Sequence, residues 1–192
     1  MIRIRRGNFD YSADEIDAMV EDVKYFKDNG ADGIVIGCLD KNFTVHVKNC
    51  QQLINAWERD KPVTFHRAFD ETNVEDLEET VEVLSLLGIK RILTSGFMAS
   101  AEQGIDNLKI LVERAKAKEI IVMPGAGVTK SNVARIISET QCKEIHASAR
   151  SELKSAIGKL SMGGGKEDLQ PLMVCDQAKV KELIAIANQI TF

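Results

Sequence analysis

A histidine, an arginine and an aspartate crowd into the stretch TFHRAFDET, directly behind the apolar pair Val63 and Phe65. At the end of a buried strand, a histidine can exchange protons and an arginine can bind anions. We therefore predict that His66 is a catalytic candidate and a ligand contact. Arg67 and Asp70 are either further ligand contacts or its scaffold, because an aspartate also caps a following helix or pairs with an arginine.

Two further segments, MIRIRR and EIHASAR, alternate apolar and polar residues. Neighbouring side chains of a strand point to opposite faces, so the first segment presents Arg3 and Arg5 on one face. The second presents Glu144, His146 and Ser148. These residue types predict a polar inner surface that binds an anion or exchanges protons, with His146 as a second catalytic candidate. The structural alternative pairs Arg5 with Glu144 as a buried ion pair.

The segment MPGAGV supplies a glycine-rich turn between an apolar run and a helical pattern. Small residues such as Gly125 and Gly127 let backbone amides approach an anion at the start of a helix. We predict an anion contact there. The alternative is a tight turn without any ligand, since glycine also ends strands for purely conformational reasons.

The elements that must position these residues are read from a repeat. Helical periodicity fills the intervals between short apolar runs, and Ser12 with Glu15 is typical of a helix-starting capping box. Repeated βα units predict a parallel sheet, either open or closed into a barrel. Equal spacing and polar strand ends favour a TIM (β/α)8-type barrel, incomplete because only six units are present. The runs begin near Ile2, Ile34, Val63, Ile92, Ile120 and Ile145.

The chain is expected to form a single, partial TIM-barrel domain over residues 1–192. Residues 151–175 are rich in Lys, Ser and Gly, and they predict a long flexible loop before a last amphipathic helix.

Composition excludes several classes of protein. The chain is 44% hydrophobic and 28% charged, with a net charge of −4, which is typical of a soluble globular protein and not of a nucleic-acid binder. No stretch approaches the roughly 20 apolar residues that a membrane span needs, and the amino terminus has no apolar signal core. We therefore expect a cytoplasmic protein with reduced thiols and neither nucleic acid nor membrane among its partners.

Six segments occur in a recognisable order: MIRIRRGNF, GIVIGCL, TFHRAFD, RILTSG, IIVMPGAGV and EIHASAR. In this respect the chain resembles the CutC copper homeostasis protein family. The resemblance implies a (β/α)8 fold of which this chain holds strands three to eight. It also implies a relation to copper.

Copper chemistry makes the cysteines relevant, because Cu(I) prefers thiolate, thioether and imidazole ligands. The cysteines have no CxxC or CxxH spacing, so neither a zinc module nor a disulfide framework is predicted. Cys38 and Cys175 are the candidate metal ligands. The alternative for Cys38 is a small buried hydrophobe, and Cys50 lies on an apolar helix face that predicts a core position.

Two functions follow as hypotheses. The first is a cytoplasmic copper homeostasis protein that binds Cu(I). The second is a barrel enzyme acting on a small anionic or phosphorylated metabolite, in which Arg3 and the glycine turn hold the anion and His66 or His146 exchanges a proton. A third possibility is action only through association, because an incomplete barrel leaves two unpaired strand edges that predict a homo-oligomer.

Overall fold

The computed structural model describes residues 1–57, 61–153 and 170–190. Helices and strands alternate along most of the chain, and the two short 3₁₀ helices are labelled η. In chain order the elements are α1 (Ala13–Asp28), β1 (Ile34–Ile36), α2 (Val47–Ala56), β2 (Val63–Phe65), η1 (Arg67–Glu71), η2 (Val74–Asp76), α3 (Leu77–Leu86), β3 (Arg91–Thr94), α4 (Ile105–Lys116), β4 (Ile121–Pro124), α5 (Val133–Thr140), β5 (Arg150–Leu153), β6 (Leu172–Cys175) and α6 (Gln177–Ala187).

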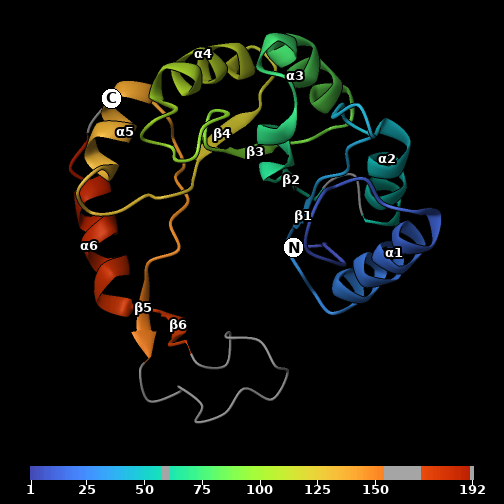
Figure 1. The fold of residues 1–192 in the computed structure, drawn as a ribbon, viewed down its shortest axis with the longest axis horizontal. Coiled ribbons are helices and arrows are strands. Elements are labelled where there is room, and N and C mark those ends of the chain that lie inside the picture. Colours follow the sequence, from blue (N-terminus) through green and yellow to red (C-terminus); the bar gives the residue numbers. More distant parts are fainter. Residues whose placement is uncertain (58–60, 154–169, 191–192) are drawn as a thin grey trace.

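Strands β1 to β4 form one parallel sheet in sequential order. The helices lie in an arc around the outside of this sheet (Figure 1). Each helix packs its apolar face inward, as a chain of βα units with short connections requires. The expected TIM (β/α)8-type architecture, in an incomplete form, is confirmed.

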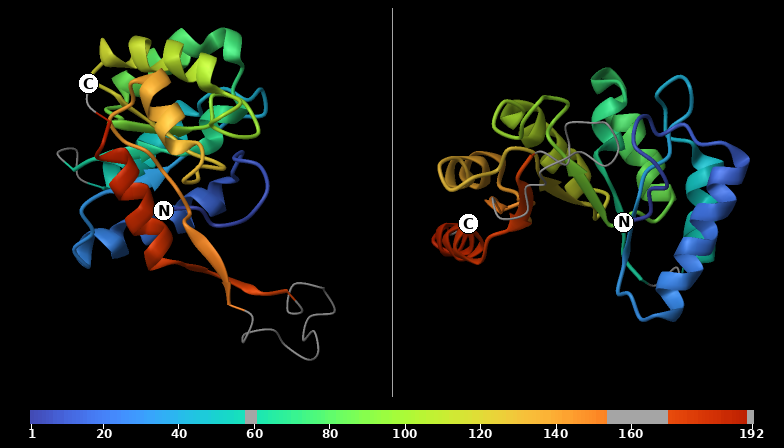
Figure 2. Two further views of the ribbon diagram at one scale, coloured as in Figure 1. Left: turned by 90° about the vertical axis from the view of Figure 1, so that its left-hand side faces the viewer. Right: turned by 60° about the horizontal axis from the view of Figure 1, so that its bottom comes forward.

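The apolar runs near Ile2 and Ile145 flank the sheet without forming strands. Ile2 donates its amide to the carbonyl of Val35 at 2.8 Å, and His146 donates to Pro124 at 2.9 Å. Each run therefore continues the sheet by a hydrogen bond at one edge, but the ladder is too short for a strand. Within residues 1–57, 61–153 and 170–190, no further strand joins the two edges, and the right-hand view of Figure 2 shows the ring of elements open between α6 and α1.

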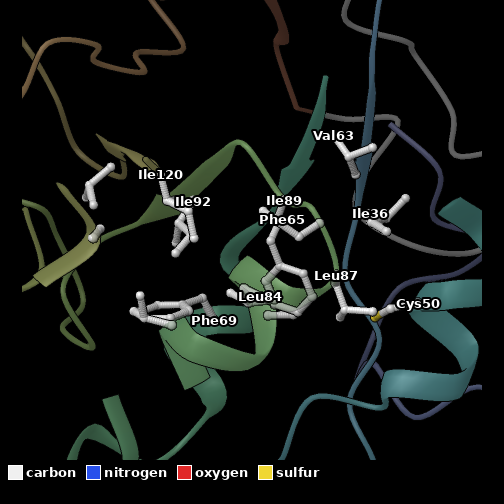
Figure 3. Packing of buried hydrophobic residues seen from close by; sticks show 14 of the residues in the cluster. Ile36, Cys50, Val63, Phe65, Phe69, Leu84, Leu87, Ile89, Ile92 and Ile120 are labelled. Carbon is white, nitrogen blue, oxygen red and sulfur yellow. The ribbon is translucent and has the colours of Figure 1, made fainter. Parts of the chain in front are cut away.

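The core lies between the outer face of the sheet and the helices. Figure 3 shows Phe65 packed with Leu84 and Leu87, while Ile92 lies beside Phe69. In β3 and β4 burial alternates, with buried residues toward the helices and half-buried residues on the other face. The inner face of the sheet is thus partly open to solvent, as expected for an unclosed barrel.

Strands β5 and β6 pair antiparallel, with Arg150 opposite Cys175 and Leu153 opposite Leu172. The segment 151–175, expected as a loop, therefore begins and ends with strands, and residues 154–169 lie outside the described part of the chain. The pair projects away from the parallel sheet (Figure 1). Sequence composition did not indicate this pairing, because the paired residues are far apart in the chain, as Arg150 and Cys175 are.

Candidate functional site

His66 follows β2, and its imidazole is enclosed on several sides. The residue is 4% exposed, and its ring centroid lies 4.8 Å from that of Phe9. A Cβ atom at Gly37 would approach its Cε1 atom to 2.3 Å, so only glycine fits at the end of β1. The Nδ1 atom accepts a hydrogen bond from the amide of Ala68 at 3.1 Å. The hydrogen of the neutral ring therefore belongs on Nε2.

The Nε2 atom of His66 is buried and has no hydrogen-bond partner in the described part of the chain. Burial, and to a smaller extent the positive charge of Arg3, lowers the pKa of His66 to about 4. At neutral pH the imidazole is therefore uncharged, with an unpartnered N–H group. Such a donor costs about 1–3 kcal/mol when left unsatisfied, so it is a natural contact for a ligand atom that accepts a hydrogen bond.

Arg3 lies close enough to this histidine for its positive charge to act on the imidazole. Its guanidinium lies 4.8 Å from the centroid of the Phe9 ring and donates to the carbonyl of Gly7 at 2.9 Å. Phe9 was not anticipated from the sequence. Arg3 and His66, both predicted ligand contacts, thus both contact the ring of Phe9.

Arg5 has a different role from the one expected. Its Nε atom donates to Glu15 at 2.6 Å, and its other nitrogens donate to Asn8 and to the carbonyl of Asp10. Glu15 also closes the capping box with Ser12, which confirms that prediction. Arg5 therefore ties the loop before α1 to the helix start.

The structural alternative, in which Arg5 pairs with Glu144, is wrong. Glu144 instead accepts from Arg91 at 2.7 Å. Arg91 begins β3, and β4 lies between it and the flanking segment that carries Glu144. The ion pair spans β4 and helps to hold that segment against the sheet. The Arg5 side chain instead points toward the loop before α1, where Glu15 and the carbonyls of Asn8 and Asp10 accept its hydrogen bonds.

Asp70 belongs to a hydrogen-bond network that joins η1 to the loop after β3. It accepts from Arg67 at 2.7 Å, from the amide of Ser95 at 3.0 Å and from the hydroxyl of Thr94. A further amide, that of Phe97, donates to it at 3.2 Å. Arg67 also donates to the hydroxyl of Ser95 at 2.8 Å. This geometry supports the scaffold interpretation of Arg67 and Asp70.

The glycine turn lies at the end of β4, beside the second histidine. A Cβ atom at Gly125 would lie 2.6 Å from Leu93 and 3.3 Å from the Cβ of His146, so the turn packs closely against this segment. Gly127 has a positive φ of 67°. Close packing and backbone conformation therefore account for both glycines. His146 and Ser148 are exposed.

The two candidate metal ligands, Cys38 and Cys175, lie in different parts of the structure. Cys38 is buried beside Cys50, whose thiol donates to the carbonyl of Cys38 at 3.7 Å. The hydrogen bond with the Cys50 thiol, and then burial, raise the pKa of Cys38. Cys175 is exposed on β6, in a different sheet from β1. In the described ranges, no group of three or more His, Cys, Asp or Glu side chains is arranged to hold a metal ion.

The sequence analysis did not identify several of the residues that line these sites. Gly37 and Phe9, which enclose His66, lie at the end of one strand and in the loop before α1. Lys130 and Arg150 line a pocket between the loop after β4 and α6. The signal that could have found Gly37, Lys130 and Arg150 is the one that found His66: a polar or small residue shortly after an apolar run.

Polar side chains thus gather where parallel strands end, on an open sheet with helices outside. The fold and the site define an incomplete (β/α)8-type barrel protein with a polar rim. No helix in the described part of the chain is long and apolar enough to cross a membrane.

The family model of the CutC family matches residues 1–151. A copper homeostasis protein cutC homolog from Homo sapiens is 42% identical over 99% of this chain and 70% of its own length. Its counterpart in Drosophila melanogaster is 35% identical over 100% of this chain and 75% of its own. The chain therefore belongs to the CutC family.

Solved structures agree with the fold. The crystal structure of a CutC protein from Streptococcus agalactiae matches with a TM-score of 0.72 and 35% identity, over 76% of this chain and 69% of that one. L-Talarate dehydratase from Polaromonas matches with a TM-score of 0.65 over 95% of this chain and 42% of that one. Identity in the second case is 10%, so that likeness concerns the fold alone.

Proposed function

We propose that this chain acts in copper homeostasis by binding Cu(I) weakly and reversibly in the cytoplasm. Its family membership and the names of its relatives support the relation to copper. The observation that carries Cu(I) binding is the placement of the free Cys50 thiol against the free Cys38 in the core, since soft sulfur ligands select Cu(I). All four cysteines are free, which favours a reducing compartment.

The state of the thiols argues for weak binding. Cu(I) binds the thiolate, so each ligand must lose its proton, and the raised pKa of Cys38 makes that loss costly at neutral pH. Binding should therefore strengthen as the pH rises. Cys175 is exposed and offers a second soft ligand that needs no opening of the core.

The test is a titration of the reduced protein with Cu(I), under anaerobic conditions and against a Cu(I)-selective chelator. We expect stoichiometric binding that falls at least about tenfold in affinity for Cys38→Ser, because one of the two neighbouring sulfur ligands is lost. A smaller loss is expected for Cys175→Ser. Cys142→Ser removes another buried thiol and is the matched control. Absence of stoichiometric binding, or equal binding by Cys38→Ser and Cys142→Ser, rejects the proposal.

A second candidate function rests on the Nε2 donor of His66, which has no partner among the described residues, and on the nearby charge of Arg3. Together they suit a small anionic metabolite, with Arg3 neutralising charge and His66 donating a hydrogen bond. His66 is less suited to proton exchange, because its Nδ1 atom is engaged with Ala68 and its pKa lies far below neutrality. Proton exchange would then fall to His146.

This candidate is tested by thermal unfolding with a panel of small carboxylates and phosphate esters. A ligand of this site raises the melting temperature of the unaltered chain but not of His66→Ala. Equal shifts in both proteins, or no shift with any compound, count against an anion site at His66.

A further inference from the structure

A pocket of about 440 Å³ lies between the loop after β4, the segment before β5 and helix α6. We name it the basic pocket. Its polar lining consists of hydroxyl groups and cationic side chains, with one carboxylate, that of Glu182, at its wall. The hydroxyl and cationic residues are Thr129, Ser131, Ser148, Lys130, Arg150 and Lys179.

The charge of the basic pocket is opposite to that of the chain. Three cationic side chains face one carboxylate there, whereas the whole chain carries a net charge of −4. Lys130 is partly neutralised by Glu182 at 3.3 Å. Lys179 donates to the backbone carbonyl of Arg150 at 2.6 Å, which holds its ammonium group at the wall. Among the described residues, the guanidinium of Arg150 has no acidic partner.

The loop that carries Lys130 is held in shape before any ligand arrives. Asn132 accepts from the amide of Thr129 at 2.8 Å and donates to the carbonyl of Gly127 at 2.9 Å. The hydroxyls of Thr129 and Ser131 lie 2.8 Å apart. A pre-shaped loop loses little conformational entropy on binding, so its contacts contribute more fully to affinity.

We propose that the basic pocket binds the phosphate group of a small phosphorylated metabolite. Cationic and hydroxyl groups reach it from three chain segments, which suits a tetrahedral dianion with several acceptor oxygens better than a planar carboxylate. The volume exceeds that of a phosphate ion and leaves room for a small organic group. The position also fits, since the pocket adjoins the ends of the last two βα units, a frequent phosphate position in TIM barrels.

The basic pocket is separate from the thiols of Cys38 and Cys50, so this inference does not depend on Cu(I) binding. The basic pocket would hold the same class of ligand as the second candidate function, a small phosphorylated metabolite. Its lining residues do not include Arg3 or His66. The identity of the organic group attached to the phosphate rests on that proposed function. Phosphate binding itself requires no catalytic turnover and no contact with His66. Failure of one proposal is therefore distinguishable from failure of the other.

The experiment is a calorimetric titration of the full chain with inorganic phosphate at constant ionic strength. We expect saturable binding to one site, weakened about tenfold by Arg150→Gln, the typical effect of losing one charge-assisted hydrogen bond. Glu182→Gln should strengthen binding severalfold, because it removes the carboxylate that competes for Lys130. A gain in affinity cannot arise from misfolding.

Arg114→Gln is the matched control, since Arg114 is an exposed arginine on α4 that pairs with Glu78. It removes the same charge from the chain and should leave phosphate affinity unchanged. The proposal is overturned by any of three results: no saturable phosphate binding, equal weakening by Arg150→Gln and Arg114→Gln, or no gain for Glu182→Gln.

Discussion

At the scale of single residues, the environment of His66 decides what this histidine can do. Its ring lies between Phe9 and Gly37, and the amide of Ala68 occupies Nδ1. Burial favours the uncharged ring, and Arg3 adds repulsion against a second positive charge. His66 is thus a neutral hydrogen-bond donor whose protonation opposes folding.

The stability of the chain should therefore fall on mild acidification. An unfolded histidine has a pKa near 6.5, whereas that of His66 in the fold is about 4, so the unfolded state binds more protons between these values. From pH 7 to pH 5 the contribution of His66 to unfolding free energy should fall by about 2 kcal/mol. Urea unfolding at both pH values measures this change.

Two variants separate this effect from other titrating groups. His66→Gln keeps an acceptor for the Ala68 amide but cannot titrate, so its stability should change about 2 kcal/mol less between pH 7 and pH 5. His146→Gln alters an exposed histidine and should keep the full pH dependence. The same pH dependence in His66→Gln and the unaltered chain would show that His66 is not buried in its neutral form.

At the scale of elements, Asp70 joins η1 to the β3–α4 connection. One carboxylate accepts from the backbone amides of Ser95 and Phe97 and pairs with Arg67. This network explains why polar residues cluster behind β2: several of them position loops rather than contact a ligand. The Arg91 and Glu144 pair does the same for the segment beside β4.

Removal of the Asp70 carboxylate should be costly. Its side chain is 8% exposed, and Asp70→Ala leaves buried amides without acceptors, which predicts a loss of about 3 kcal/mol in unfolding free energy. Asp106→Ala is the control, because that side chain is 96% exposed and lies 3.6 Å from Lys109. Its cost should stay below about 0.5 kcal/mol. Comparable losses in the two variants would remove the structural role assigned to Asp70.

At the scale of the whole molecule, the sheet has two edges that no strand covers within the described residues. Unpaired backbone groups at a sheet edge favour pairing with another chain. Ile4, which follows the segment beside β1, is 42% exposed. We therefore propose that the chain folds as one cooperative domain and self-associates through its edges.

Sedimentation velocity over a range of protein concentrations tests this association. We expect dimers or larger species that dissociate on dilution. A charge at an edge disfavours pairing, so Ile4→Lys should shift the chain toward monomer. Ile110→Lys places the same charge on α4, where the isoleucine is 53% exposed, and should not. A monomer at every concentration, or the same distribution for both variants, would refute edge association.

Local pattern was sufficient to predict much of this molecule. Helical periodicity, the capping box of Ser12 and Glu15, and the alternation that sends Ile145 and Ala147 toward α6 depend on residues a few positions apart. The position of His66 at a strand end follows in the same way. Such patterns are set by the repeat lengths of helix and strand, so the sequence alone contains them.

Only the tertiary structure determined which side chains and which strands pair with one another. Arg91 meets Glu144 across 53 positions of the chain, and Cys38 meets Cys50 rather than Cys175. The same holds for the antiparallel pairing of β5 with β6 and for the gathering of Lys130, Arg150 and Lys179. Side-chain partners depend on where distant segments come to lie, and burial then sets the charge state of groups such as His66. Neither the partner of a side chain nor its charge state can be read from the spacing of residues in the sequence.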